Sequence, residues 1–243
     1  MNNGTVKPNV VELHNTLAQG WEQKYTRSRF RRRAVHCLKG IEAIPLSGQL
    51  WLDGGCGTGF LSRQLLARGC SVIGVDASTE MLRIAQSQTP EEMESACLYC
   101  RVATIECLPL PDASFDGVVC SSVIEYLDRP EACLAELSRV LKPGGILLLS
   151  APNRQSLLRR CLKLAYAVSG VFSANPWPDY MGYSMNEYSR ADFIQSLERH
   201  GLSVRRVDNY SPFESPFLPA RWAGSLLVGM AVKPCLSPTS GQS

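Results

Sequence analysis

Short apolar runs alternate with segments of helical spacing from residue 49 onward. This alternation is typical of βαβ units, in which a helix crosses back between two parallel strands. The first unit combines a strand at 50–52, a helix at 60–68 and a strand at 72–75. The strands predicted in this way are residues 50–52, 72–75, 97–102, 116–120, 146–150, 203–207 and 226–232.

Capping residues mark the helices between these strands. Gly69 suits the end of the first helix, Ser78 can cap the second, and Pro130 suits the first turn of the third. Residues 189–192 form a capping box for a fourth helix, which ends at Gly201. The apolar faces of the four helices carry Leu61, Leu65 and Leu66; Met81, Leu82 and Ala85; Leu134, Leu137, Val140 and Leu141; and Phe193, Ile194 and Leu197.

The last two strands have a different connection. Residues 208–225 are too short and too rich in proline for a crossover helix, so these strands are expected to be antiparallel. The prediction is therefore an α/β fold: a seven-stranded, mostly parallel sheet with an antiparallel last strand and helices on both faces, arranged as a three-layer sandwich.

Two segments fall outside the βα rhythm. We expect residues 1–48 to form an N-terminal helical cap, and residues 151–188 to form a substrate-covering insertion in a core at 49–233. Within the insertion, residues 157–165 have amphipathic helical spacing. This helix could contact lipid or pack on the domain, and its shortness favours packing. Residues 234–243 are expected to be a flexible tail.

Composition narrows the class of protein. A formal charge of +3 is too small for a polybasic membrane anchor or a general nucleic-acid binder. The sequence shows neither a signal peptide nor an apolar stretch long enough to span a membrane, which predicts a soluble, cytoplasmic protein.

Ten cysteines are scattered along the sequence. Cys97 and Cys100 form a C-x-x-C pair that could be redox-active or half of a zinc site. Without a second pair, core thiols and no metal are the favoured interpretation.

The glycine-rich loop at 53–59 lies between a predicted strand and a predicted helix, where glycines let the backbone approach a ligand closely. A dinucleotide fingerprint, G-x-G-x-x-G, does not match, because Gly55, Gly57 and Gly59 place the third glycine one residue early. A phosphate-binding loop fails too, since no lysine follows. Asp53 would repel a pyrophosphate but suits a ligand with a positive end.

At this loop the sequence resembles the class I S-adenosylmethionine-dependent methyltransferases, whose first motif is (D/E)-x-G-x-G-x-G. The resemblance runs from about Trp21 to Val232, and in detail it is to the ubiquinone-biosynthesis-like, small-molecule branch. It implies that Asp76, which closes the second strand, accepts both ribose hydroxyls of the cofactor. It also implies that Thr104, which replaces the usual aspartate, and Ile105 hold the adenine edge.

Further motifs extend the resemblance. Residues 121–126 resemble the family's fourth motif, with Glu125-Tyr126 where the branch commonly has Glu-His, and 141–145 match its L-K-P-G-G turn. Related enzymes cover the cofactor with a leading helix that reaches its carboxylate through Tyr or Arg, which implies Tyr25 or Arg33. The candidate cofactor-binding residues are Asp53, Gly54, Gly55, Cys56, Gly57, Asp76, Ala77, Met81, Thr104, Ile105, Ser121, Tyr25 and Arg33.

The acceptor of the methyl group should lie beyond the carboxyl ends of the strands, where open α/β sheets bind ligands. Aromatic residues of the insertion and of the 208–225 loop could line an apolar pocket there. The candidate substrate-binding residues are Trp177, Tyr180, Tyr183 and Phe213. A general base is optional in methyl transfer, and the candidates are Tyr126, Glu125, His14 and Tyr183, each of which could equally serve packing.

Three functions remain open from the sequence. The leading one is methyl transfer from S-adenosylmethionine, giving S-adenosylhomocysteine, to an oxygen or nitrogen of a small, partly apolar metabolite, without nucleic acid as partner. An RNA or protein methyltransferase is the second, because a cluster of arginines could face phosphates; its members are Arg27, Arg29, Arg31, Arg32 and Arg33. A non-enzymatic cofactor-binding regulator is the third. The oligomeric state, monomer or dimer, is left open.

Overall fold

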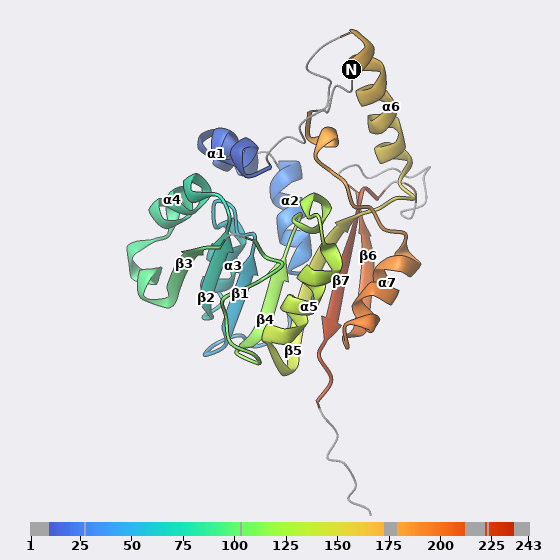
Figure 1. Ribbon diagram of the computed structural model, residues 1–243. Coiled ribbons are helices and arrows are strands. Elements are labelled where there is room, and N and C mark those ends of the chain that lie inside the picture. The colour runs from blue at the N-terminus through green and yellow to red at the C-terminus, as the bar shows by residue number, and fades with distance from the viewer. Residues whose placement is uncertain are drawn as a thin grey trace, which may run out of the picture.

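The computed structural model describes residues 10–26, 28–102, 104–172, 179–211, 222 and 224–235 of the 243-residue chain. Its centre is a seven-stranded sheet in the order β3-β2-β1-β4-β5-β7-β6 (Figure 1). The strands are β1 (Leu50–Gly54), β2 (Ser71–Asp76), β3 (Cys97–Arg101), β4 (Phe115–Cys120), β5 (Leu141–Pro152), β6 (Ser203–Tyr210) and β7 (Leu226–Val232).

Strand directions confirm the predicted fold class. The pairs β1–β2, β2–β3, β1–β4 and β4–β5 are parallel, whereas β7 is antiparallel to both of its neighbours, β5 and β6. The order of the strands reverses direction between β1 and β4. Ligands of open α/β sheets bind beyond the carboxyl ends of the strands at such a switch point.

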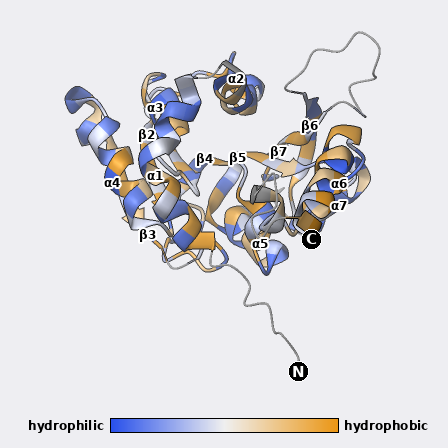
Figure 2. Ribbon diagram, turned by 90° about the horizontal axis from the view of Figure 1, so that it is seen from above, coloured by the Kyte–Doolittle hydropathy of each residue, from blue (hydrophilic) through white to orange (hydrophobic). Residues whose placement is uncertain are grey.

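Helices cover both faces of this sheet. Figure 2 shows α2 and α3 on one face and α5 and α7 on the other. The helices are α1 (Val10–Thr26), α2 (Ser28–Cys37), α3 (Phe60–Leu66), α4 (Thr79–Gln88), α5 (Pro130–Val140), α6 (Leu157–Phe172) and α7 (Arg190–Arg199), with short 3-10 helices η1 (Lys39–Ile41), η2 (Glu91–Ala96), η3 (Ile124–Tyr126) and η4 (Asp179–Gly182).

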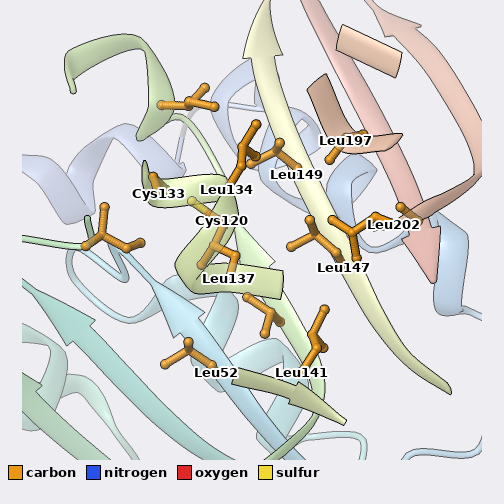
Figure 3. Packing of buried hydrophobic residues seen from close by; sticks show 14 of the residues in the cluster. Leu52, Cys120, Cys133, Leu134, Leu137, Leu141, Leu147, Leu149, Leu197 and Leu202 are labelled. Carbon is orange, nitrogen blue, oxygen red and sulfur yellow. The ribbon is translucent and has the colours of Figure 1, made fainter. Parts of the chain in front are cut away.

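Successive strand residues point to opposite faces, so each face has its own core. Trp51 of β1 is fully buried against α2 and α3, whereas the next residue, Leu52, is fully buried beneath α5. In the second core, shown in Figure 3, Leu134 and Leu137 of α5 meet side chains from the neighbouring strands. This two-sided burial fixes the register of the sheet and thereby the positions of the loops at its edge.

The predicted caps are present. Ser78 Oγ accepts a hydrogen bond from the Met81 amide at the start of α4, and Ser189 and Asp192 complete the capping box of α7. Among the strands, the largest boundary difference is in β5, which begins five residues before the predicted start, so that Leu141 belongs to this strand and not to the preceding helix face. Gly144, with φ of +83°, lets the chain bulge between the paired residues Phe115–Leu141 and Gly117–Ile146. The expected turn is therefore absorbed into the strand.

The helix predicted inside the insertion is longer than its amphipathic core suggests, and it packs on the domain through only one side. Arg159 is buried in an ion pair with Glu187 at 2.9 Å. The opposite side is apolar and exposed, and its most exposed members are Leu164, Val168, Val171 and Phe172. No helix in the described part of the chain has the length and apolarity needed to cross a membrane.

Candidate cofactor and acceptor site

The glycine-rich loop joins β1 to α3 at the carboxyl edge of the sheet. Gly55, Gly57 and Gly59 all have positive φ, at 70°, 53° and 75°, a region that other residues rarely adopt. A Cβ on Gly55 would lie 2.3 Å from the Val123 side chain, whereas one on Gly57 would meet no atom within 4 Å. Gly55 therefore permits close packing inside the protein, and Gly57 leaves its backbone facing open space.

Asp53 is the residue before the end of β1 and has almost no exposed surface. Ser62 Oγ of α3 donates to its Oδ2 at 2.6 Å. Desolvation by burial raises the pKa of Asp53 to about 7, with a smaller contribution from the nearby charge of Asp76, and the Ser62 hydrogen bond only partly offsets this. A cationic ligand group beside Asp53 would favour its ionised form.

Asp76 ends β2 and is fixed from both sides. Its Oδ2 accepts the Gly57 amide at 2.9 Å, and its Oδ1 accepts the Ser78 amide at 2.8 Å. A carboxylate has about four lone-pair sites, so each oxygen keeps capacity for one more donor. The carboxylate is therefore held ready for a pair of ligand hydroxyls, as the resemblance implies.

A cavity of about 490 Å³ opens between this loop, the ends of β2 and β4, and the helix α1. One end is lined by Ala77 and Met81 after β2 and by Thr104 and Ile105 after β3. Ile105 and Met81 are buried apolar side chains, which suit a flat heterocycle. Among the predicted cofactor residues Ser121, Cys56 and Gly57 also line the cavity. Gly54 does not, but its missing Cβ lets Ile105 approach closely.

Glu106 was missed by the sequence reasoning. It lines the cavity beside Thr104, whose hydroxyl donates to Glu106 Oε2 at 2.9 Å. Its other oxygen accepts the Arg129 amide. The Thr104 hydroxyl proton is therefore already donated to Glu106. The Glu106 carboxylate lies near the position at which the family usually has an aspartate. The available signal was the acidic residue two positions after Thr104.

Aromatic side chains form much of the remaining cavity wall. The rings of Trp21 and Phe30 lie 6.0 Å apart edge to face, and Tyr25 stacks on Phe60 at 4.1 Å. The aromatic residues that line the cavity are His14, Trp21, Tyr25, Phe30, Tyr126 and Tyr183. Trp21 and Phe30 were not predicted as site residues. The available signal was their helical spacing from two predicted residues, Tyr25 and Arg33.

Tyr25 and Arg33, the predicted contacts to the cofactor's carboxylate, both line the cavity near the glycine loop. Arg33 donates to Ser122 Oγ at 2.9 Å, and its guanidinium lies 4.8 Å from the centre of the Phe30 ring. Burial raises the pKa of Tyr25 to about 12, so its hydroxyl keeps its proton at neutral pH. Arg31 and Arg32 are exposed instead, so the members of the predicted arginine cluster do not all face the same way. Arg27 and the side chain of Arg29 lie outside the described part.

The candidate bases are placed differently. His14, Tyr126 and Tyr183 line the cavity. Glu125 does not: its side chain is buried, Oε2 has no hydrogen-bond partner, and desolvation by burial raises its pKa. Of the predicted substrate-binding residues, Tyr183 is brought to the cavity. Trp177, Phe213 and the side chain of Tyr180 lie outside the described residues.

The C-x-x-C pair is accommodated on a strand. Cys97 and Cys100 are free thiols on β3, where they pair with Val72 and Val75 of β2. Within the described ranges, no group of three or more His, Cys, Asp or Glu could hold a metal ion.

Comparison with known proteins agrees with this geometry. Residues 52–149 match the model of a methyltransferase domain family. The ubiquinone biosynthesis O-methyltransferase of Rattus norvegicus is 34% identical over 178 residues, which are 70% of this chain and 49% of that protein. The chain spans about half the length of the curated relatives it matches.

Solved structures share the fold. An S-adenosylmethionine-dependent methyltransferase of Thermotoga maritima matches with a TM-score of 0.66 at 21% identity, over 93% of this chain and 100% of that chain. The magnesium protoporphyrin IX methyltransferase of Synechocystis, which has S-adenosylhomocysteine bound, matches with a TM-score of 0.59 at 20% identity, over 95% and 90%. Taken with the motifs at the sheet edge, these matches show that the chain belongs to the class I S-adenosylmethionine-dependent methyltransferases.

Proposed function

We propose that this protein transfers a methyl group from S-adenosylmethionine to an oxygen or nitrogen of a small, partly apolar metabolite. The observation that carries the proposal is that one cavity is lined both by polar groups and by aromatic side chains. The polar part, which includes the glycine loop and Asp76, suits the cofactor. The aromatic side chains offer apolar surface to an acceptor.

The residues at the polar end fit the cofactor. The open face of Gly57 gives room for its amino-acid part, Asp76 is free to accept from ribose hydroxyls, and Met81 and Ile105 offer apolar faces to adenine. Arg33 and Tyr25 would hold its carboxylate. When bound, the cofactor supplies a methyl group on a positively charged sulfur. The protein's main contribution is then to orient an acceptor atom in line with that group.

The segment after α6 supplies one wall of the acceptor end. Gly182, Tyr183 and Met185 line the cavity. The amides of Met185 and Asn186 donate to the Glu125 carbonyl at 2.8 and 3.2 Å, which ties the far end of this wall to η3. We propose that residues 179–184 close over the acceptor. Ligand should then slow amide hydrogen exchange there, and equal exchange with and without cofactor and acceptor would contradict closure.

Oxygen is the favoured acceptor atom within the proposal, because the rat relative is named as an O-methyltransferase. A reducing compartment such as the cytoplasm fits the ten free cysteines of the chain.

Calorimetry tests the first step. S-adenosylhomocysteine should bind and NAD should not, and the opposite result would contradict the proposal. A screen of phenols, enols, carboxylic acids and amines with methyl-labelled S-adenosylmethionine then tests the transfer itself. Label recovered in a small product supports the proposal. Label recovered only in RNA or protein after adding cell extract would favour the alternative.

A further inference from the structure

His14 of α1 has its ring orientation and tautomer set by the backbone. Nδ1 lies 2.8 Å from the Val10 carbonyl oxygen, one turn earlier in the helix. A carbonyl oxygen only accepts hydrogen bonds, so Nδ1 must carry the proton. In the neutral ring Nε2 is then the nitrogen with the lone pair. His14 is one of the residues that line the cavity.

The position of the ring is fixed by its neighbours. It lies 5.4 Å from the Trp21 ring and 5.5 Å from the ring of Tyr126, the last residue of η3, the short helix that follows β4. Asn15, the next residue, accepts a hydrogen bond from Ser78 Oγ at 2.6 Å. Ala18 packs with Met81 in a small core between α1 and α4. Figure 1 shows α1 beside α4, above one end of the sheet, and residues of both helices line the cavity.

Several other ionisable groups that line the cavity have hydrogen-bond partners. Asp53 accepts from Ser62, Glu106 accepts from Thr104, and Arg33 donates to Ser122. Asp76 accepts two backbone amides at the cofactor end. The remaining ionisable residues of the lining are Tyr25, Cys56, Tyr126, Asp128 and Tyr183. Among the described residues, no hydrogen bond joins His14 Nε2 to another group, and the ring lies beside the aromatic rings of Trp21 and Tyr126.

From this geometry, and resting on the proposed function, we propose that His14 Nε2 is the general base for a hydroxyl acceptor, so that the reaction is O-methylation. As the acceptor oxygen's lone pair bonds to the methyl carbon, the carbon–sulfur bond breaks and its electron pair stays on sulfur. The hydroxyl proton passes to Nε2, and the imidazolium later loses it to solvent. A neutral amine acceptor would not need such a base.

The first test needs no acceptor. S-adenosylmethionine carries a positive charge on sulfur that S-adenosylhomocysteine lacks. If His14 lies beside the transferred methyl group, that charge should change the ¹⁵N chemical shift of Nε2 between the two complexes. Two-bond ¹H–¹⁵N spectra of the labelled protein measure this chemical shift and the tautomer, and loss of the signal in His14→Gln assigns it.

The chain contains a matched control for this measurement. His200 Nδ1 makes the same contact with the carbonyl one turn earlier, Ser196 O, at 2.8 Å, but at the end of α7, outside the cavity lining. Its ¹⁵N chemical shifts should be the same in both complexes. Equal chemical shifts for His14 Nε2 in the two complexes, or an Nε2–H tautomer in the neutral ring, would overturn the inference. If calorimetry then still showed binding of S-adenosylmethionine and S-adenosylhomocysteine, the proposed function would stand. If neither ligand bound, both the proposed function and the inference about His14 would be overturned.

A second test uses the acceptor found in the screen. His14→Gln should lower kcat about 100-fold or more, remove the acidic limb of the pH–rate profile, and leave the KM for S-adenosylmethionine within a few-fold. His200→Gln should match the wild type. A loss of less than about threefold in His14→Gln, or a product methylated on nitrogen, would overturn the assignment of His14 as base without contradicting methyl transfer.

Discussion

Replacing Asp53 by asparagine should make the ligand-free protein more stable at neutral and alkaline pH. The carboxyl group is almost fully buried, and its desolvation raises its pKa from 3.8 to about 7. Asparagine has nearly the same shape, cannot ionise, and can still accept the hydrogen bond from Ser62 through its amide oxygen. The substitution therefore removes the buried charge and keeps the packing.

The sign and size follow from proton linkage. Between about pH 4 and pH 7 the folded state keeps the Asp53 proton while the unfolded state has lost it, so stability falls as the pH rises. A difference of roughly three pKa units corresponds to about 4 kcal/mol across the whole window. Part of this window lies below pH 5. Between pH 5 and pH 8 the advantage of Asp53→Asn over the wild type should grow by about 3 kcal/mol.

Urea unfolding at a series of pH values, without ligand, measures this difference. Asp116→Asn is the control with the opposite sign. The hydrogen bonds of Asp116 with Lys142 and the Leu50 amide outweigh its desolvation and lower its pKa, so it stabilises the fold above the unfolded-state pKa. Asp116→Asn should therefore lose stability relative to the wild type as the pH rises through the range where this carboxylate ionises. An Asp53→Asn advantage that does not change between pH 5 and pH 8 would refute the burial argument.

Three further substitutions test other parts of the site and the fold. Asp76→Ala should weaken S-adenosylhomocysteine binding by about tenfold or more, from the 1.5–3 kcal/mol typical of charged hydrogen bonds, and unchanged calorimetric affinity would remove the ribose role. Tyr183→Ala should reduce turnover while cofactor affinity stays within a few-fold; a collapse of cofactor binding would instead place Tyr183 against the cofactor. Arg159→Ala removes one of the two cations that pair with the buried carboxylate of Glu187, which keeps Lys163 at 2.6 Å, and should cost about 2 kcal/mol in urea unfolding. Arg83→Ala, which breaks an exposed pair, should cost less than about 1 kcal/mol, and equal costs would contradict the role of burial.

The sequence alone determined the architecture and the cofactor end of the site. Alternating apolar periods locate the strands, and the short, proline-rich 208–225 connection indicates the antiparallel last strand. Capping by Ser78 and the positive φ of Gly55 and Gly57 depend on residue type within a few positions. Such local rules can be read from a sequence because their partners are near in the chain. Parallel pairing then brings Asp53 and Asp76 to one edge without further information.

The packing of α1 and α2 over the cavity was decided only by the tertiary structure. Arg33 reaches Ser122 across 89 sequence positions, and His14 meets Tyr126 only because α1 docks on α4. No local pattern encodes those pairings, since α1 and α2 precede the sheet and their register on it is set by packing. Burial is likewise a property of the fold. The same carboxylate type titrates near 7 at Asp53 and below its usual range at Asp116, because one is desolvated and the other paired with Lys142.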